Sequence, residues 1–219
     1  VLASGAVVND ILEVVAYTTF DTANVTASSG FTVTGNLSVD GGTIKLDGNY
    51  PVGTANVALG DAALDALTSG GSNVAIGGGS LTSNTSGNNN VGIGRRALLS
   101  NTSGGANVAI GLDTLQANTT ASNNTAVGYQ AGYSNTTGHS NTSVGKGAFY
   151  TNTTGNENNA FGFQALYSNT TGSTNTALGR NTLYTNTTGS QSVAVGNNSL
   201  YYNTTGGNNT AVGYLALTA

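Results

Sequence analysis

A glycine recurs every 17 residues through most of this chain, and this period limits the folds that the chain can adopt. Each of these glycines closes a phrase such as NTAVG, and a second set, with the same step, closes phrases such as SNTTG. The first set is Gly60, Gly77, Gly94, Gly111, Gly128, Gly145, Gly162, Gly179, Gly196 and Gly213. The second set is Gly70, Gly87, Gly104, Gly138, Gly155, Gly172, Gly189 and Gly206, with Ala121 in place of one glycine. A short, fixed period without insertions is typical of a solenoid, in which each repeat is one coil and equivalent residues stack.

The composition of the repeat favours strands over helices. Helical repeats need roughly thirty or more residues per unit, and the Asn, Thr and Gly that fill this repeat are poor in helix interiors. We therefore predict an all-β fold, a parallel β-solenoid (β-roll or β-helix) of about ten 17-residue coils over residues 51–219. The handedness of the coil stays open.

Residues 1–50 do not follow the period and are predicted to form a small N-terminal β-rich cap or connector. In the stretch 31–49 apolar residues largely alternate with polar ones, and Gly-Asn and Gly-Gly pairs punctuate them as turns. We expect these short strands to cover the first coil, whose open edge would otherwise invite aggregation.

Two columns of apolar residues are predicted to face the interior of the coils. One column precedes the first set of glycines, and the other follows those glycines by four residues. The first column is Leu59, Ile76, Ile93, Ile110, Val127, Val144, Phe161, Leu178, Val195 and Val212. The second is Leu64, Leu81, Leu98, Leu115, Phe149, Leu166, Leu183, Leu200 and Leu217, interrupted by Gly132. Alanines beside both columns are expected to allow close approach of coils or chains.

The NTTG phrase is predicted to form the corner of each coil. Asn tolerates a left-handed backbone and bonds its own main chain, and Gly adopts positive φ without steric cost. Asn residues 17 positions apart, such as Asn135 and Asn152, are expected to exchange amide hydrogen bonds from coil to coil.

A single 17-residue coil encloses little apolar volume, so the chain is expected to associate. Ordering such a coil costs roughly 25 kcal/mol at about 1.5 kcal/mol per residue, whereas burying one Leu, one Val and two Ala returns only about 6 kcal/mol. Stacking supplies part of the difference, and partner chains are expected to cover further apolar surface. The predicted assembly is a homotrimer.

Composition excludes several classes of function. The net charge is -4, and the only basic residues are Lys45, Arg95, Arg96, Lys146 and Arg180. These are too few for a phosphate-tracking surface, so nucleic acid is not an expected partner. No apolar stretch is long enough for a membrane span, and the absence of Cys excludes thiolate metal sites. No cofactor or metal is expected.

The tyrosine column is the most informative candidate surface. Five tyrosines recur at the coil spacing and could either stack against sugar faces or pack on one another or across a chain interface. They are Tyr133, Tyr150, Tyr167, Tyr184 and Tyr201. One residue after the first set of glycines, Tyr129, Phe163 and Tyr214 alternate with Lys, Arg and Asn, as on an outward surface.

No catalytic constellation is evident, and we predict that the chain is not an enzyme. The only histidine, His139, occupies a corner and is interpreted as a solvated turn residue. Asp61 and Asp65 are interpreted as a polar cap of the first coil, because hard cations need more oxygen ligands. Glycoside hydrolysis needs two carboxylates across a cleft, but Asp113 and Glu157 lie more than two coils apart.

The repeat resembles two groups of fibrous surface proteins. NVAIG and NTAVG are similar to the head repeats of trimeric autotransporter adhesins, whose coils are shorter. The fuller phrase NTAVGYQAGYSNTTG, with NLSVDGGTIKLDGN before the repeats, resembles tail-fibre proteins of tailed bacteriophages.

This second resemblance implies a homotrimeric fibre module at the virion surface that contributes to recognition of, or attachment to, a host cell. Other virion proteins and host surface glycans would be its partners. A bacterial trimeric surface adhesin, at the cell surface, and a carbohydrate-active tail spike are the alternatives.

Overall fold

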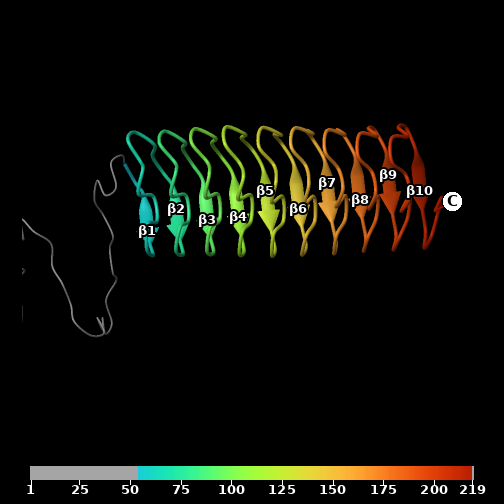
Figure 1. Ribbon diagram of the computed structural model, residues 1–219, viewed down its shortest axis with the longest axis horizontal. Helices are drawn as coiled ribbons and strands as arrows, with labels where there is room; N and C mark the ends of the chain where they lie inside the picture. Colours follow the sequence, from blue (N-terminus) through green and yellow to red (C-terminus); the bar gives the residue numbers. More distant parts are fainter. Residues whose placement is uncertain (1–53, 219) are drawn as a thin grey trace, which may run out of the picture. The chain divides into compact units, whose positions relative to one another are not determined.

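The computed structural model describes residues 54–218, which form a continuous stack of coils (Figure 1). Each coil contributes one strand of three residues, and successive strands begin 17 residues apart. The strands are β1 (Val57–Leu59), β2 (Val74–Ile76), β3 (Val91–Ile93), β4 (Val108–Ile110), β5 (Thr125–Val127), β6 (Thr142–Val144), β7 (Asn159–Phe161), β8 (Thr176–Leu178), β9 (Val193–Val195) and β10 (Thr210–Val212). The strands predicted in residues 1–50 lie outside the described residues, and the domain boundary stays a prediction.

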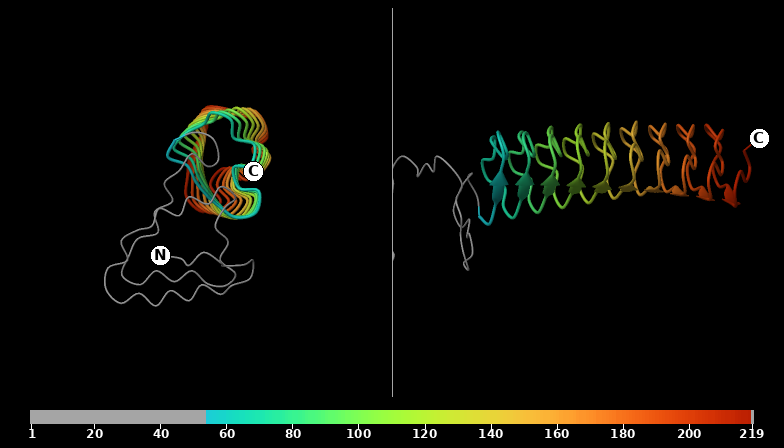
Figure 2. Two further views of the ribbon diagram at one scale, coloured as in Figure 1. Left: turned by 90° about the vertical axis from the view of Figure 1, so that its left-hand side faces the viewer. Right: turned by 90° about the horizontal axis from the view of Figure 1, so that it is seen from below.

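The ten strands form one parallel sheet in sequence order, β1 to β10. Val127 pairs with Val144, and Val144 pairs with Phe161, so residues 17 positions apart lie on neighbouring strands in register. Viewed along the stack, the coils superimpose closely (Figure 2). The predicted parallel β-solenoid is therefore confirmed.

Backbone hydrogen bonds join the coils well beyond the short strands. The N–H of Phe149 donates to the carbonyl of Ala165 at 2.9 Å, and the N–H of Thr153 donates to the carbonyl of Thr170 at 2.9 Å. At the corner the direction reverses, because the N–H of Glu157 donates to the carbonyl of His139 in the preceding coil at 3.1 Å. Each coil is thus bonded to its neighbours around its perimeter, which links the coils into one rod.

The predicted core was only half right. The Leu and Phe column lies inside, and Leu81, Leu98 and Leu166 are fully buried. The column before the first set of glycines faces outward instead, with Leu178 49% and Val212 71% exposed. Side chains of a strand point alternately to its two faces, so the middle residue of each three-residue strand points inward and its two neighbours point outward.

Alanine is the inward residue of most strands. Ala75, Ala126 and Ala160 are fully buried, so these alanines form the core rather than the surface at which coils or chains approach. These alanines pack in the same buried clusters as the Leu column, so small side chains complete the narrow interior of a 17-residue coil. At Gly132 the hydrophobic interior divides into two clusters, and an added Cβ there would lie 2.8 Å from Cδ2 of Leu115.

The prediction that the glycines of the NTTG phrase adopt positive φ was also wrong. Left-handed backbone occurs at the first set of glycines, such as Gly145 at φ 131°, and at non-glycine residues including Gln130, Leu166 and Glu157. Glycines of the NTTG phrase are absent from this group; at Gly138 an added Cβ would lie 2.4 Å from the carbonyl oxygen of Gly155. Close approach between coils, rather than positive φ, explains glycine in that phrase.

Two buried asparagine columns confirm the predicted amide ladder. Asn152 donates from Nδ2 to Oδ1 of Asn135 at 2.7 Å, and Asn169 donates in the same way to Asn152 at 2.9 Å. In the other column, which precedes the strands, the backbone N–H of Asn124 donates to Oδ1 of Asn107 at 3.0 Å. These side chains satisfy polar groups that the narrow interior would otherwise leave unpaired.

Candidate functional site

The predicted tyrosine column lies on the outer side of the turn that follows the Leu column, and its rings are half-buried. Successive rings from Tyr133 to Tyr201 stack with centroids 5.0 to 5.2 Å apart and interplanar angles of 5° to 9°. Tyr202 contacts the last ring edge-on at 4.8 Å. The ring faces within the column are thus occupied by neighbouring rings. A glycan contact stays a prediction, and it would use ring edges and hydroxyl groups rather than free faces.

The environment of Tyr150, in the middle of this column, changes its acidity. Burial, followed by the neighbouring Tyr133 and Tyr167 hydroxyl groups, raises the pKa of Tyr150 above its usual range. Both causes disfavour the charged phenolate, so Tyr150 is a neutral phenol at neutral pH. Its hydroxyl group can donate and accept hydrogen bonds.

A second outward column combines aromatic rings with cations. It follows the first set of glycines directly, and we call it the aromatic–cation column; its central members are Arg95, Leu112, Tyr129, Lys146, Phe163 and Arg180. The Lys146 ammonium lies over the Tyr129 ring at 5.7 Å, and the Arg180 guanidinium lies over the Phe163 ring at 5.7 Å. Both rings remain exposed, Tyr129 by 43% and Phe163 by 39%. The predicted outward orientation of Tyr129, Phe163 and Tyr214 is confirmed.

A small hollow connects the aromatic–cation column with the tyrosine column. It has a volume of about 110 Å³ and is lined by Tyr129, Gln130, Lys146, Gly147, Tyr150, Gln164 and Tyr167. Gly147 occupies the position between two glutamines, and an added Cβ there would lie 3.5 Å from Cγ of Gln164 and 3.5 Å from Cε2 of Tyr167. The hollow exists because this coil lacks the side chain that its neighbours carry.

The charged residues of the sequence analysis do not converge on a catalytic arrangement. Arg96 holds Asp113 in a bidentate ion pair, with Nε to Oδ1 at 2.7 Å and the second nitrogen to Oδ2 at 2.8 Å. His139 and Glu157 lie at exposed corners of neighbouring coils. Asp61 and Asp65 are exposed on the first described coil. In residues 54–218 no group of three or more His, Cys, Asp or Glu is placed to hold a metal ion.

Among residues 54–218, no segment covers the outer face of the ten-stranded sheet. Each strand presents its first and third residues on this face, and none of these residues in β1–β10 is charged. Leu59, Ile110 and Leu178 are each more than one third exposed. Parallel sheets are normally covered on both faces, so this face is a candidate interface. The sequence analysis missed it because it placed the third residue of each strand inside.

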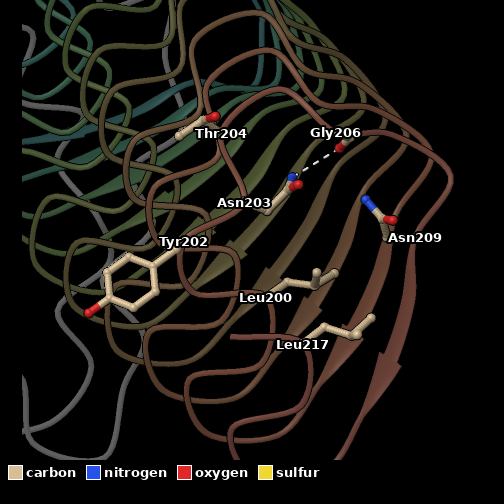
Figure 3. Close-up of a pocket in the computed structure, with 7 residues that line it drawn as sticks. All are labelled: Leu200, Tyr202, Asn203, Thr204, Gly206, Asn209 and Leu217. Atoms are coloured by element: carbon tan, nitrogen blue, oxygen red, sulfur yellow. Dashed lines mark hydrogen bonds between the residues drawn. The ribbon is translucent and has the colours of Figure 1, made fainter. Parts of the chain in front are cut away.

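A hollow near the last coil is part of the stacking surface. Its volume is about 330 Å³, and Figure 3 shows Leu200 and Leu217 on one side and Asn203, bonded to the carbonyl of Gly206, on the other. Equivalent residues in earlier coils are covered by the coil that follows. This hollow therefore continues the interior of the solenoid and carries no separate argument for a ligand.

The alternation of the aromatic–cation column is visible in the sequence. Reading every seventeenth residue from Tyr129 gives Tyr, Lys, Phe and Arg, which alternate aromatic and basic side chains. The period alone places these residues side by side, but the cation–π contacts depend on the direction in which each side chain leaves the turn.

Comparison of the chain with protein-family models, with curated proteins and with solved structures gives no significant match. Residues 54–218 also contain no helix of the length and apolar character that a membrane crossing requires.

Proposed function

We propose that this chain is a structural and adhesive module of a bacteriophage tail fibre, exposed on the virion and contributing to attachment to the host cell. The observation that carries the proposal is the unbroken register of ten parallel strands over nine 17-residue steps, from Val57 to Thr210. At about 4.8 Å per strand, these steps span roughly 43 Å. Such a stack supplies length and stiffness, which a fibre needs.

The phage assignment draws on the repeat phrases. NTAVGYQAGYSNTTG and NLSVDGGTIKLDGN are similar to tail-fibre sequences, whereas the NTAVG core alone also fits a bacterial surface adhesin. The carbohydrate-active spike is less well supported, because a hydrolase needs two carboxylates across a cleft and Asp113 is held by Arg96.

Association with further copies of the same chain is part of the proposal, with three chains per fibre. The uncovered outer face of the sheet is the proposed interface, since it carries Val, Ile, Leu, Phe, Thr and Asn but no charge. Depletion of charge is typical of the centre of a protein interface. Stacked strands make this face continuous along β1–β10, so each chain can contact its partners over the whole rod.

Mass measurement in solution tests the assembly. The wild-type chain should have the mass of three copies, and Leu178→Asp, which places a charge on the proposed interface, should shift the population to single chains. Thr137→Asp introduces the same charge at an exposed corner and should leave the trimer intact. A wild-type mass of one chain would contradict the proposed assembly.

Attachment is tested with fluorescently labelled protein and a panel of bacterial strains. We expect saturable binding to some strains, and preincubation with the protein should slow adsorption of a phage that carries this fibre. Absence of binding to every strain that such a phage infects would contradict the adhesive role, although the rod-like architecture would be unaffected.

A further inference from the structure

We infer that a linear acidic polysaccharide binds along the aromatic–cation column and the adjoining hollow. The inference rests on the proposed function in one respect: attachment to a bacterium brings the rod against surface polysaccharide. It deepens that function by naming the ligand class and by moving the contact away from the faces of the tyrosine column.

The first argument is the placement of the basic residues. Four of the five basic residues of the chain lie among residues 54–218, and all four project from the aromatic–cation column or from the position next to it. Arg96 is neutralised by Asp113, whereas Arg95, Lys146 and Arg180 are exposed and form no ion pair within the described part of the chain. Within residues 54–218, the basic side chains without an ion pair therefore lie along one line.

The second argument is the interleaving of these cations with aromatic rings. Lys146 and Arg180 each lie over the ring of the preceding coil, which holds Tyr129 and Phe163 in defined orientations while leaving them about 40% exposed. An exposed, oriented aromatic ring offers an apolar surface for the C–H groups of a sugar, and a tyrosine adds a hydroxyl group. The adjacent cation is placed to meet an anionic group on the same or the next sugar.

The third argument is the polar lining of the hollow. Gln130 and Gln164 flank the gap at Gly147, and Tyr150 and Tyr167 form its other wall. Carboxamides donate and accept hydrogen bonds at once, as sugar hydroxyl groups do. A volume of about 110 Å³ accommodates part of one sugar ring rather than a whole ligand. A polymer that continues along the column fits this shape better than an isolated small molecule does.

Spacing favours a polysaccharide over a nucleic acid. Lys146 and Arg180 are two coils apart and Arg95 and Lys146 are three, which corresponds to roughly 10 Å and 14 Å at about 4.8 Å per coil. A phosphate backbone carries charge more densely than three cations in six coils can match. A polysaccharide with one carboxylate every one or two sugars provides anions at the observed intervals.

The column also remains accessible in the proposed assembly. Burying an unpaired Lys or Arg at an interface is costly, whereas the outer sheet face bears no charge. The two surfaces are therefore suited to different roles: the sheet face to other chains, and the aromatic–cation column to a charged polymer in solvent.

The test measures binding of the full chain to polygalacturonate by titration calorimetry, with dextran as the neutral polymer and single-stranded oligothymidylate as a polyanion without sugar carboxylates. We expect binding to polygalacturonate only. The triple variant R95Q/K146Q/R180Q should bind about tenfold more weakly, since each exposed charge pair contributes modestly. Unchanged affinity of the triple variant, or equal binding of dextran or oligothymidylate, would overturn the inference.

Gly147→Gln provides a second variant that the fold should accept. Gln130 and Gln164 occupy the equivalent positions with φ of 55° and 53°, and Gly147 has φ of 63°. The new side chain should fill the hollow and weaken polygalacturonate binding about threefold. The thermal unfolding temperature should fall only slightly, because a non-glycine residue adopts left-handed backbone at a modest cost. Glu157 is exposed and does not line the hollow, so Glu157→Gln should leave affinity within about twofold and serves as the control.

A parallel measurement on cells separates the two proposals. Protein that attaches to bacteria but ignores polygalacturonate would retain the adhesive function and overturn the acidic-polysaccharide inference. Protein that binds polygalacturonate but attaches to no strain would support the binding site and contradict the proposed attachment role.

Discussion

Replacing Asn152 by Ala tests the amide ladder that runs through the interior. Asn152 is fully buried; its Nδ2 donates to Oδ1 of Asn135 and to the carbonyl of Gly155, and its Oδ1 accepts from Asn169 and from the N–H of Gly155. Truncation leaves Oδ1 of Asn135, one N–H of Asn169 and the N–H of Gly155 without these partners. Unpaired buried polar groups cost about 1–3 kcal/mol each, so we expect the three groups together to give a loss of at least about 3 kcal/mol.

The matched control is Asn88→Ala. The Asn88 side chain makes two hydrogen bonds, with the N–H of Gly71 and the carbonyl of Ser86, but it is exposed, so water replaces the lost amide. Its loss should stay below about 1 kcal/mol. Urea unfolding followed by circular dichroism compares the two variants.

Hydrogen exchange provides a local measure of the same change. Because each coil contacts only its neighbours, faster exchange in Asn152→Ala should be concentrated in the coils that contain Asn135 and Asn169. Equal unfolding midpoints for Asn152→Ala and Asn88→Ala would refute the view that the buried amides stabilise the stack.

Three further predictions concern the backbone, the core and the tyrosine column. Gly145→Val should lower the free energy of unfolding by about 3 kcal/mol or more, because φ is 131° and an added Cβ would lie 2.4 Å from the backbone of the next coil. His139 is exposed, so His139→Ala should change the melting temperature little. Ala160→Leu should overpack the interior and lower the free energy of unfolding by about 1–3 kcal/mol. Phe161→Leu, on the outer sheet face, should lower it less. Similar losses for the two variants in urea titrations would contradict the assignment of Ala160 to the interior and Phe161 to the outer face. Because the pKa of Tyr150 is raised in the folded state, the contribution of this residue to stability is present below about pH 10 and declines as pH rises through the folded-state pKa. Denaturation at a series of pH values should therefore show a smaller alkaline loss of stability for Tyr150→Phe than for the wild type.

The inner and outer faces of the strands could not be assigned from hydrophobicity alone. The pattern of Ala126 followed by Val127 makes the larger residue the natural choice for the core, yet Ala126 is fully buried and Val127 lies on the outer face. Which face of the strand is buried depends on the width of the coil, and the backbone turns set that width. These include leucines such as Leu166, at φ 51°, whose left-handed conformation no propensity scale favours.

The candidate surfaces were predictable to different degrees. The period placed Tyr133 and Tyr150 in one column, but only the geometry decided that the rings stack on each other at 5.0 Å. The contact between the Lys146 ammonium and the Tyr129 ring likewise depended on the directions of the two side chains. The hollow at Gly147 could be recognised only from the three-dimensional structure, because its walls come from residues of three different coils.

The sequence by itself determined the solenoid, because a constant 17-residue step is best satisfied when each repeat forms one coil and equivalent residues stack. It also determined which residues share a column. The tertiary structure decided which columns are inside and which side chains touch, because these properties depend on backbone turns that bring distant parts of one coil together. A period counts residues along the chain, whereas burial and contact depend on where the chain turns in space.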